Sequence, residues 1–482
     1  MRQHWTSLTS KVQGSKQASI LFKNLGHGLE GNVSGQTSTR GDADTDALRY
    51  QIIDTLFGLN AEFVQTWPGS LLFCDYLEES SMTLIKHKYD VIWKMIGTND
   101  PPNLRDCWEW YFTVLSAAKN LVPENTTIDT ICFQLACDKN FSITSNGVLQ
   151  LTETQLDEAR RAIFAVLCWT SATLVPILSR PSNPVSPESL TPALPKTWVQ
   201  DSNHVLSRSD YKRPAAKVFR GFRINWADPI TGMAGATFDS AFGDALFETS
   251  ITYVSLYRIG HVKLKLVDTI TDHLHFNRQA RTLALFRFPT FCVMSILRTT
   301  KLAVMESILL ELLPVRFGYA SMQDPTSIYR EILLSYRLLF GQSSKSRTLM
   351  KQYLHQLKRD GDYVDPFLVT LCTTPISSFH DKSSLLQEIF PNSTLDVHGR
   401  FKESSTYSAQ DDFPIYGFRL QTLQRYSMRQ RPSRVKDLWC DRRNPLQWYT
   451  FWTVLWIGGA TIILSSLQLA VSIAQLYYAI RI

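Results

Sequence analysis

A run of 37 residues near the C-terminus, from Asn444 to Ile480, contains no charged side chain. A helix needs about 20 consecutive apolar residues to cross the hydrocarbon core of a bilayer. A helix of a soluble protein is rarely so long without a charge on its solvent face, which makes a buried core helix the weaker interpretation. The run therefore predicts one transmembrane helix at residues 446–480.

Aromatic residues stand at both ends of this predicted helix. Trp448, Tyr449 and Trp452 crowd its start, and Tyr477 and Tyr478 mark its end. The helical rise from Trp448 to Tyr478 is about 45 Å, close to the thickness of a bilayer with its headgroup layers. Since aromatic rings prefer those layers, we expect these five residues at the two membrane interfaces.

Small and polar side chains recur inside the run at alternating steps of three and four residues. This spacing places them in one stripe, where small residues let helices approach and amides hydrogen-bond to a partner. The stripe predicts a homo-oligomer or a membrane partner, and the alternative is that this more polar half lies partly in the interface. Its members are Gly458, Thr461, Ser465, Gln468, Ser472 and Gln475.

Basic residues precede the run. Of the net charge of +7, residues 413–445 hold +6, with Arg442 and Arg443 next to the run, and Arg481 supplies the rest. Basic flanks favour the cytosolic side, which predicts a cytosolic N-terminal region and a tail-anchored, single-pass membrane protein. Residues 1–412 are formally neutral, so the excess of basic residues lies next to the predicted transmembrane helix. This position indicates contact with the anionic headgroups of a lipid bilayer and no nucleic acid partner.

The remaining length suffices for about three domains of ordinary size. Residues 1–43, rich in Gly, Ser, Thr and Gln, predict a flexible tail without a cleaved secretory signal. Five prolines between 181 and 195 predict a stiff linker. The expected order is a tail at 1–43, a helical domain at 46–178, a Pro-rich linker at 179–217, a mixed region of sheet then helices at 218–412, a basic juxtamembrane segment at 413–445 and the transmembrane helix.

Residue periodicity predicts an α+β fold. Helical spacing begins near Leu48, and Thr152 with Gln155 forms a capping box before a helix whose apolar run at 162–178 is interpreted as buried, not as a second span. Alternation at 262–266 and 273–276, followed by a return strand at 282–288, predicts a small antiparallel sheet within 218–290. Asp324-Pro325 and Asp365-Pro366 predict two further helix starts.

His273 and His275 are the weak candidates for a metal site. On one strand they would point to the same face, as metal ligands do, and His261 would add a third nitrogen; a solvated face is the alternative. The sequence contains no G-x-S-x-G, H-E-x-x-H or C-x-x-C motif. We therefore predict no catalytic residue and no cofactor.

Four segments of the C-terminal part carry a resemblance. They are LFRFP at 285–289, LSYRLLFGQ at 334–342, SAQDDFP at 408–414 and DRRNPLQWYTFW at 441–452. They resemble a family of uncharacterised proteins from filamentous ascomycete fungi with a C-terminal membrane segment, and the resemblance covers about residues 150–482. It implies a membrane-bound end and a fungal origin, and it brings no catalytic residue.

Two hypotheses about function follow. The leading one is a single-pass membrane protein, anchored at its C-terminus, whose cytosolic region acts as a scaffold or regulator by binding an unknown protein partner. The alternative is a membrane-tethered enzyme or accessory factor of lipid or specialised-metabolite chemistry, which a deep pocket lined by carboxylates or by His273 and His275 would favour. Glycosylation sequons at Asn32, Asn125, Asn140 and Asn392 are expected to stay unmodified in a cytosolic region.

Overall fold

The computed structural model describes residues 43–481 with gaps. The predicted tail up to residue 42, most of the Pro-rich linker and residues 431–444 of the basic segment lie outside the described residues. The gaps are residues 68, 87–88, 99–101, 123–124, 139–150, 177–207, 221, 223–243, 301, 314–323, 378–386, 399–400 and 431–444.

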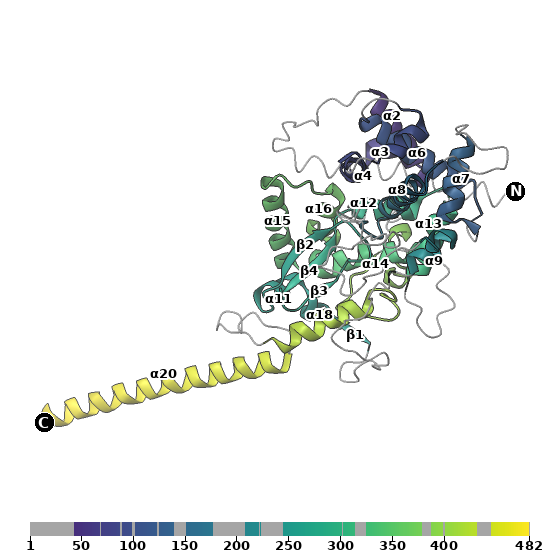
Figure 1. Ribbon diagram of the computed structural model, residues 1–482. Helices are drawn as coiled ribbons and strands as arrows, with labels where there is room; N and C mark the ends of the chain where they lie inside the picture. The colour runs from purple at the N-terminus through teal and green to yellow at the C-terminus, as the bar shows by residue number, and fades with distance from the viewer. Residues whose placement is uncertain are drawn as a thin grey trace.

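The predicted α+β class is confirmed. Helices dominate a folded body that contains two small sheets, and one long apolar helix, α20 (Pro445–Arg481), extends away from it (Figure 1). In the view of Figure 1, the N-terminal helices lie at the end of the body opposite to α20. The body and α20 can therefore be discussed separately.

The N-terminal block is helical, as the periodicity predicts. Ile52 and Leu56 of the first helix are buried. The capping box is confirmed, because the amide of Thr152 donates to Gln155 Oε1 at 2.9 Å while the amide of Gln155 donates to Thr152 Oγ1 at 3.3 Å. The helices are α2 (Ala43–Phe57), α3 (Ala61–Thr66), α4 (Gly69–Lys86), α5 (Asp90–Ile96), α6 (Leu104–Lys119), α7 (Ile128–Asp138) and α8 (Glu153–Ser171).

After the gap at 177–207, the chain packs against this same block. The short helices η2 (Asp210–Lys212) and α9 (Ala215–Arg220) occupy the described end of the predicted linker, and the Ala215 amide donates to the Thr126 carbonyl oxygen at 2.8 Å. α9 packs on α13 (Ala303–Leu312). One continuous hydrophobic core includes residues from α2 through α18, so segments on both sides of the linker share a core.

The larger sheet is mixed. Strands β2 (Lys263–Val267), β4 (Thr282–Phe286) and β3 (Phe276–Asn277) lie side by side in that order. β3 and β4 pair antiparallel as predicted, whereas β2 runs parallel to β4. Residues 271–274 form turns instead of a strand, with Leu274 at φ 60°, and β3, which follows them, lies on the far side of β4 from β2, so that β4 pairs with both. β1 (Ala245–Phe247) and β5 (Thr406–Ser408) form a separate antiparallel pair.

Helices surround the sheets. Asp365 caps α16 (Pro366–Thr373) as predicted, accepting the Phe367 amide at 2.8 Å. The other Asp-Pro start is wrong by two residues, since Asp324 accepts the Thr326 amide at 2.9 Å in a turn and the helix begins at Ser327. The remaining elements are α10 (Glu248–Ile251), α11 (Tyr253–Arg258), α12 (Pro289–Leu297), α14 (Ser327–Tyr336), η4 (Arg337–Gly341), α15 (Ser344–Arg359), η6 (Asn392–Thr394) and α18 (Gly417–Arg429).

Candidate functional site

The predicted transmembrane segment forms one uninterrupted helix. Within α20, the 33 residues from Trp448 to Ile480 are long and apolar enough to cross a membrane. Core helices of soluble proteins pass the same test but are buried, and signal sequences pass it near the N-terminus. Every residue from Thr453 to Ile480 is exposed, and the helix lies at the C-terminal end of the chain. Neither of those two explanations fits α20.

Four hydroxyl groups of α20 donate to carbonyl oxygens of the same helix. Thr461 Oγ1 donates to the Ile457 carbonyl oxygen at 2.8 Å, and Ser472 Oγ donates to the Gln468 carbonyl oxygen at 2.9 Å. Thr453 and Ser466 make the same bond to the residue four positions before. A hydroxyl bonded in this way needs no water, so these side chains are compatible with a lipid environment.

The predicted packing stripe lies on the exposed surface of α20. Its six residues, Gly458, Thr461, Ser465, Gln468, Ser472 and Gln475, are all exposed. A Cβ atom added at Gly458 would meet nothing within 4 Å in the single chain. Nothing within the chain therefore requires a glycine there, and packing through the stripe stays a prediction.

Aromatic rings cluster at both ends of the apolar helix. Trp448 lies 5.1 Å from Tyr449 and 5.9 Å from Trp452, measured between ring centroids. At the other end, the rings of Tyr477 and Tyr478 are 6.0 Å apart. Such clusters match the preference of Trp and Tyr for headgroup layers, and they bracket the stretch that would lie in hydrocarbon.

The basic segment before α20 is divided between the core and the surface. Arg419 is buried, and its Nη1 donates to the carbonyl oxygens of Thr271 at 2.6 Å and His273 at 2.5 Å. Arg429, ten residues later, is exposed, while Arg442 and Arg443 lie outside the described residues. The sequence sum of +6 therefore overstates the charge at the membrane surface by one, because Arg419 fixes α18 to the body.

A buried carboxylate holds the start of α18. Glu331 of α14 accepts the amide of Ile415 at 3.0 Å and that of Tyr416 at 2.9 Å. These amides precede the first turn of α18, where a negative charge is favoured by the helix dipole. Tyr416 Oη donates to the Ile270 carbonyl oxygen at 2.6 Å. The last helix before the anchor is thus fastened to both α14 and the loop after β2.

The candidate metal residues are not brought together. His273 is fully buried in a turn before β3, so the reading of a solvated face is wrong for it. Its Nδ1 accepts the Phe286 amide at 3.2 Å, which places the proton on Nε2, and Nε2 donates to Ser335 Oγ at 2.8 Å. Burial, together with the charge of Arg419, lowers the pKa of His273 well below its ordinary value. No group of three metal-ligating side chains lies within the described part of the chain.

The contact between His273 and Ser335 is not a catalytic pair. A base that activates a serine must accept the hydroxyl proton, whereas His273 Nε2 carries a proton and Ser335 Oγ donates to the Ile332 carbonyl oxygen at 2.7 Å. Ser335 is also fully buried. Both side chains therefore act as links within the core.

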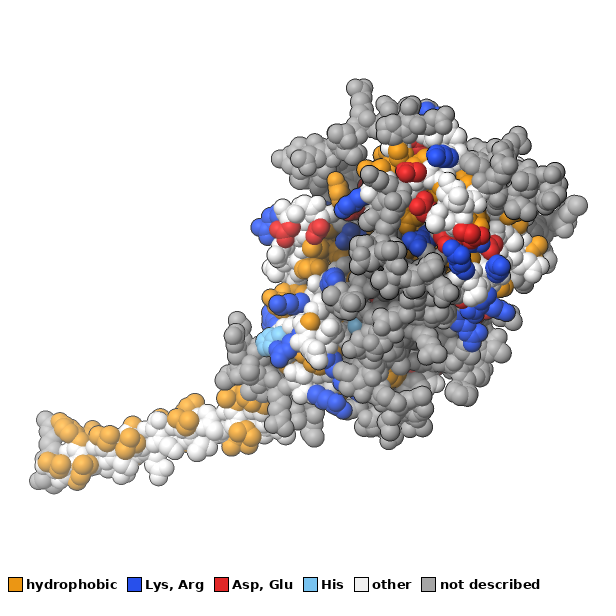
Figure 2. Space-filling model, viewed as in Figure 1, with side chains coloured by type: hydrophobic (Ala, Val, Ile, Leu, Met, Phe, Trp, Pro, Cys, Tyr) orange, Lys and Arg blue, Asp and Glu red, His pale blue; other side chains and the backbone are white. Residues whose placement is uncertain are grey.

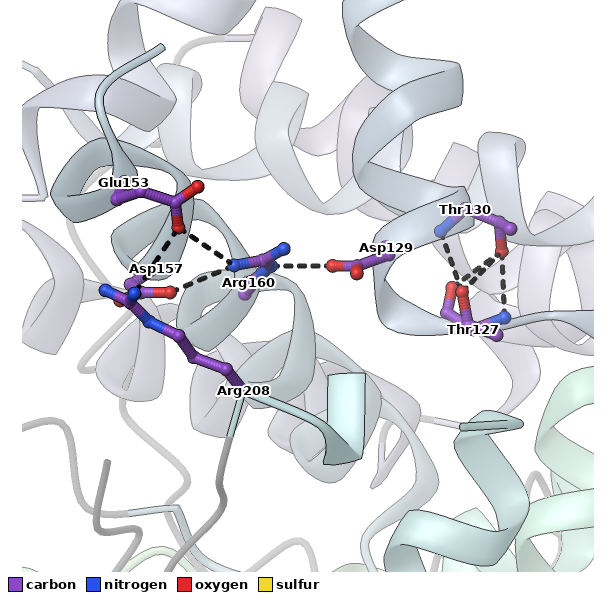
Figure 3. Close-up of polar contacts among 7 residues, drawn as sticks. All are labelled: Thr127, Asp129, Thr130, Glu153, Asp157, Arg160 and Arg208. Atoms are coloured by element: carbon purple, nitrogen blue, oxygen red, sulfur yellow. Dashed lines mark hydrogen bonds and ion pairs between the residues drawn. The ribbon is translucent and has the colours of Figure 1, made fainter. Parts of the chain in front are cut away.

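A second charged cluster, missed by sequence reasoning, surrounds Arg160 of α8 (Figure 3). Arg160 Nε donates to Asp129 Oδ1 of α7 at 2.6 Å, and its Nη1 donates to Asp157 Oδ1 at 3.0 Å. Arg208, which follows the gap at 177–207, donates to the other oxygen of Asp157 at 2.9 Å. The cluster joins α7, α8 and the returning chain. Only the spacing from Asp157 to Arg160 was visible in the sequence.

No protein-family model, curated protein or solved structure matches this chain. The resemblance to proteins of filamentous ascomycete fungi therefore stays a prediction. Function has to be inferred from α20, the basic segment and the body.

Proposed function

We propose that this chain is a single-pass membrane protein, anchored by its C-terminal helix, whose N-terminal body faces the cytosol and acts as a scaffold or regulator. The observation that carries the proposal is α20, in which a predominantly apolar stretch of 33 residues contains no buried residue. In water, this much unpartnered apolar surface would drive aggregation, whereas a bilayer removes it from water.

The orientation rests on the distribution of basic residues. Seven surface or undescribed basic residues of the segment 413–445 precede α20, and its opposite end carries Arg481. The positive-inside preference places the heavier basic flank in the cytosol. The organelle is left open, because every cytosol-facing membrane satisfies this preference.

The role as scaffold or regulator is supported by how the body uses its polar groups. His273, Ser335 and Glu331 are buried and bonded to partners within the core, which accounts for them as structural groups. We therefore assign binding of a partner to the surface of the body. His273, Ser335 and Glu331 take no part in it. The partner itself is proposed to be a protein.

Protease protection of the full chain tests the anchor and its orientation together. With one epitope at each end, protease added to sealed membranes is expected to remove the N-terminal epitope and leave a small protected fragment that contains α20. Alkaline carbonate should leave the protein in the membrane pellet. A body that survives protease would overturn the orientation, and release by carbonate would overturn the anchor.

The native sequons provide an independent control. Asn125 and Asn392 lie in the described body and begin acceptor triplets. In cells they should stay unmodified, so a glycosidase that removes N-linked sugars should leave the electrophoretic mobility unchanged. A mobility shift that is lost in Asn125→Gln with Asn392→Gln would place the body in the lumen.

Self-association through the polar stripe is a separate part of the proposal. Crosslinking in mild detergent should give a dimer band for the full chain that Gln468→Leu weakens, since the amide can hydrogen-bond across a helix seam. Ile463→Leu, outside the stripe, is the matched control. Monomer alone in all three proteins would contradict the seam.

A further inference from the structure

The formal neutrality of residues 1–412 hides two regions of opposite charge. The helical block from 43 to 176 contains 17 acidic and 9 basic residues. By contrast, α15 contains five basic residues and no acidic one, and α18 contains three and none. In the view of Figure 2, Lys, Arg and His side chains lie beside the base of α20, and the acidic side chains lie farther from it, together with further Lys and Arg side chains. The body is therefore electrically polarised.

Helix α15 presents its basic residues to solvent. Lys345 and Lys351 are exposed, whereas Met350 and Leu354 on the opposite side are buried in the core. The helix is followed by two exposed acidic residues, Asp360 and Asp362, so its basic character is concentrated toward its N-terminal half.

Strand β2, which contacts α15, also carries exposed basic residues. Lys263 and Lys265 alternate with half-buried residues along β2 and are both exposed. The Lys263 amide donates to the Arg281 carbonyl oxygen at 2.8 Å, which places exposed Arg281 next to Lys263. Two acidic residues lie nearby, Asp268, which pairs with Arg287 at 3.0 Å, and Asp272; both also interact electrostatically with Lys265, and together they are outnumbered by Lys263, Lys265, Arg281 and Arg287. The surface charge of this part is therefore positive.

Contacts join these elements to α18. Ser346 Oγ of α15 accepts the Val254 amide of α11 at 3.1 Å, and Tyr353 Oη donates to the Leu264 carbonyl oxygen of β2 at 3.4 Å. Tyr426 of α18 donates to the Gly260 carbonyl oxygen at 2.8 Å, and its ring lies 4.6 Å from that of Phe276 between centroids, tilted by 59°. Burial raises the pKa of Tyr426, and the nearby Arg281 guanidinium opposes the rise.

These residues define one basic face, made of Lys263, Lys265, Arg281, Lys345, Lys351 and Arg429. It includes the end of α18, from which the chain leaves for the anchor. The 15 residue steps from Gln430 to Pro445 reach at most about 50 Å, so α20 holds this face within reach of the bilayer. Because the anchor keeps the body near the bilayer, the effective concentration of lipid headgroups at the basic face is high.

We propose that the basic face docks on the anionic leaflet of the membrane that holds α20. The inference rests on the proposed cytosolic orientation, because the cytosolic leaflet carries the anionic lipids. The acidic N-terminal block is repelled by the same leaflet and is turned away from it. The body is thereby held in one orientation, with the acidic block presented to the cytosol.

Vesicle flotation tests the face without the anchor. Residues 1–430 are suitable, since no residue of α20 belongs to the hydrophobic core. They should float with vesicles of phosphatidylcholine containing 30 mol% phosphatidylserine, remain unbound with pure phosphatidylcholine, and be released by 0.5 M salt. The triple variant Lys263→Glu, Lys265→Glu, Arg281→Glu should lower the partition coefficient by about 100-fold.

A matched variant separates the face from overall charge. Lys86→Glu, Lys94→Glu and Lys119→Glu change the net charge by the same amount on exposed residues of the acidic block and should leave most of the binding intact. Equal losses in both variants, or unchanged binding of the first, would overturn the proposal. So would binding of residues 1–430 to duplex DNA but not to the anionic vesicles. Circular dichroism checks that both variants fold.

Failure of this inference differs from failure of the proposed function. If the full chain resists carbonate and its body is digested by protease, but residues 1–430 do not float, the anchor stands and the docking face is wrong. If the face binds vesicles while protease spares the body, the orientation is wrong.

Discussion

Helices α8 and α20 are both long and rich in apolar residues, yet they lie in opposite environments. α8 (Glu153–Ser171) carries five charged residues in its first nine positions and is buried from Ala162 through Ser171. α20 carries no charge before Arg481 and is exposed along nearly its whole length. The apolar run of α8 ends before it could span a bilayer, whereas that of α20 continues. Length and the position of charges distinguish a core helix from an anchor.

The two helices also satisfy their polar groups differently. Arg160 of α8 is paired with Asp129 and Asp157, and Arg208 from a distant segment completes the cluster. Four hydroxyls of α20 bond to carbonyl oxygens of the same helix. A core helix depends on partners from the rest of the fold, and α20 depends on none. Substitutions in the body should therefore change unfolding, and those in α20 should change membrane insertion.

The largest expected effect is on insertion. Leu464→Arg with Leu467→Arg puts two charges at the centre of α20, at a cost of about 5–7 kcal/mol on translocon scales. The full chain should become extractable by alkaline carbonate. Leu464→Ala with Leu467→Ala is the control and should remain in the pellet. A doubly charged variant that resists extraction would show that α20 is not the anchor.

Removing Arg160 should destabilise the body by about 3 kcal/mol, because Arg160→Leu leaves half-buried Asp129 without this partner and leaves buried Asp157 with Arg208 alone. Urea unfolding of residues 1–430 measures the loss. Arg105→Leu breaks an exposed pair with Glu109 and should cost less than about 0.5 kcal/mol. Similar costs for the two variants would mean that the Arg160 cluster is no more than a surface contact.

Asp365 should make stability depend on pH. Burial raises the pKa of Asp365 to about 6, against hydrogen bonds from Thr290 and Phe367 that oppose the rise. The folded state then binds the proton more tightly than the unfolded chain, so this contribution is present below about pH 4 and is lost as pH rises to about 6. The loss is up to about 3 kcal/mol. Asp365→Asn should flatten the unfolding free energy over that range, and an unchanged slope would contradict the assignment.

The smallest effect concerns the start of α8. Thr152→Ala removes the side chain that accepts the Gln155 amide and should cost about 1 kcal/mol of unfolding free energy. Thr152→Ser keeps the hydroxyl and should recover most of it. Carbonate extraction of the full chain should be the same for both. Equal stability of the two variants would indicate that the cap is not formed.

Local features of the fold were predictable from the sequence, and long-range ones were not. The length and end points of α20, the capping box at Thr152 and the cap at Asp365 depend on neighbouring residues, so the sequence pattern contains them. The parallel pairing of β2 with β4 depends on the path of residues 268–275, where Leu274 takes a left-handed conformation. The path of these residues is stabilised by a long-range contact, because Arg419 of α18 donates to the carbonyl oxygens of Thr271 and His273.

The same distinction applies to the candidate site. The aromatic ends and the polar stripe of α20 were visible as spacing. Arg419 was counted as a surface charge because nothing in the spacing of basic residues distinguishes a buried guanidinium from an exposed one. The basic face was missed because it is assembled from β2, α15 and α18, which lie far apart in the sequence.

The aromatic ends of α20 also set a membrane thickness. The 25 residue steps between Trp452 and Tyr477 rise about 38 Å, between the roughly 30 Å of a hydrocarbon core and the roughly 40–45 Å of a bilayer with its headgroup layers. Any apolar length beyond the local hydrocarbon thickness is absorbed by tilting or by local stretching of the lipids, and either costs energy. Sterol- and sphingolipid-rich bilayers are thicker, so the mismatch is smaller there than in the endoplasmic reticulum. The length between the aromatic ends of α20 is therefore a property to which membranes of different thickness respond differently.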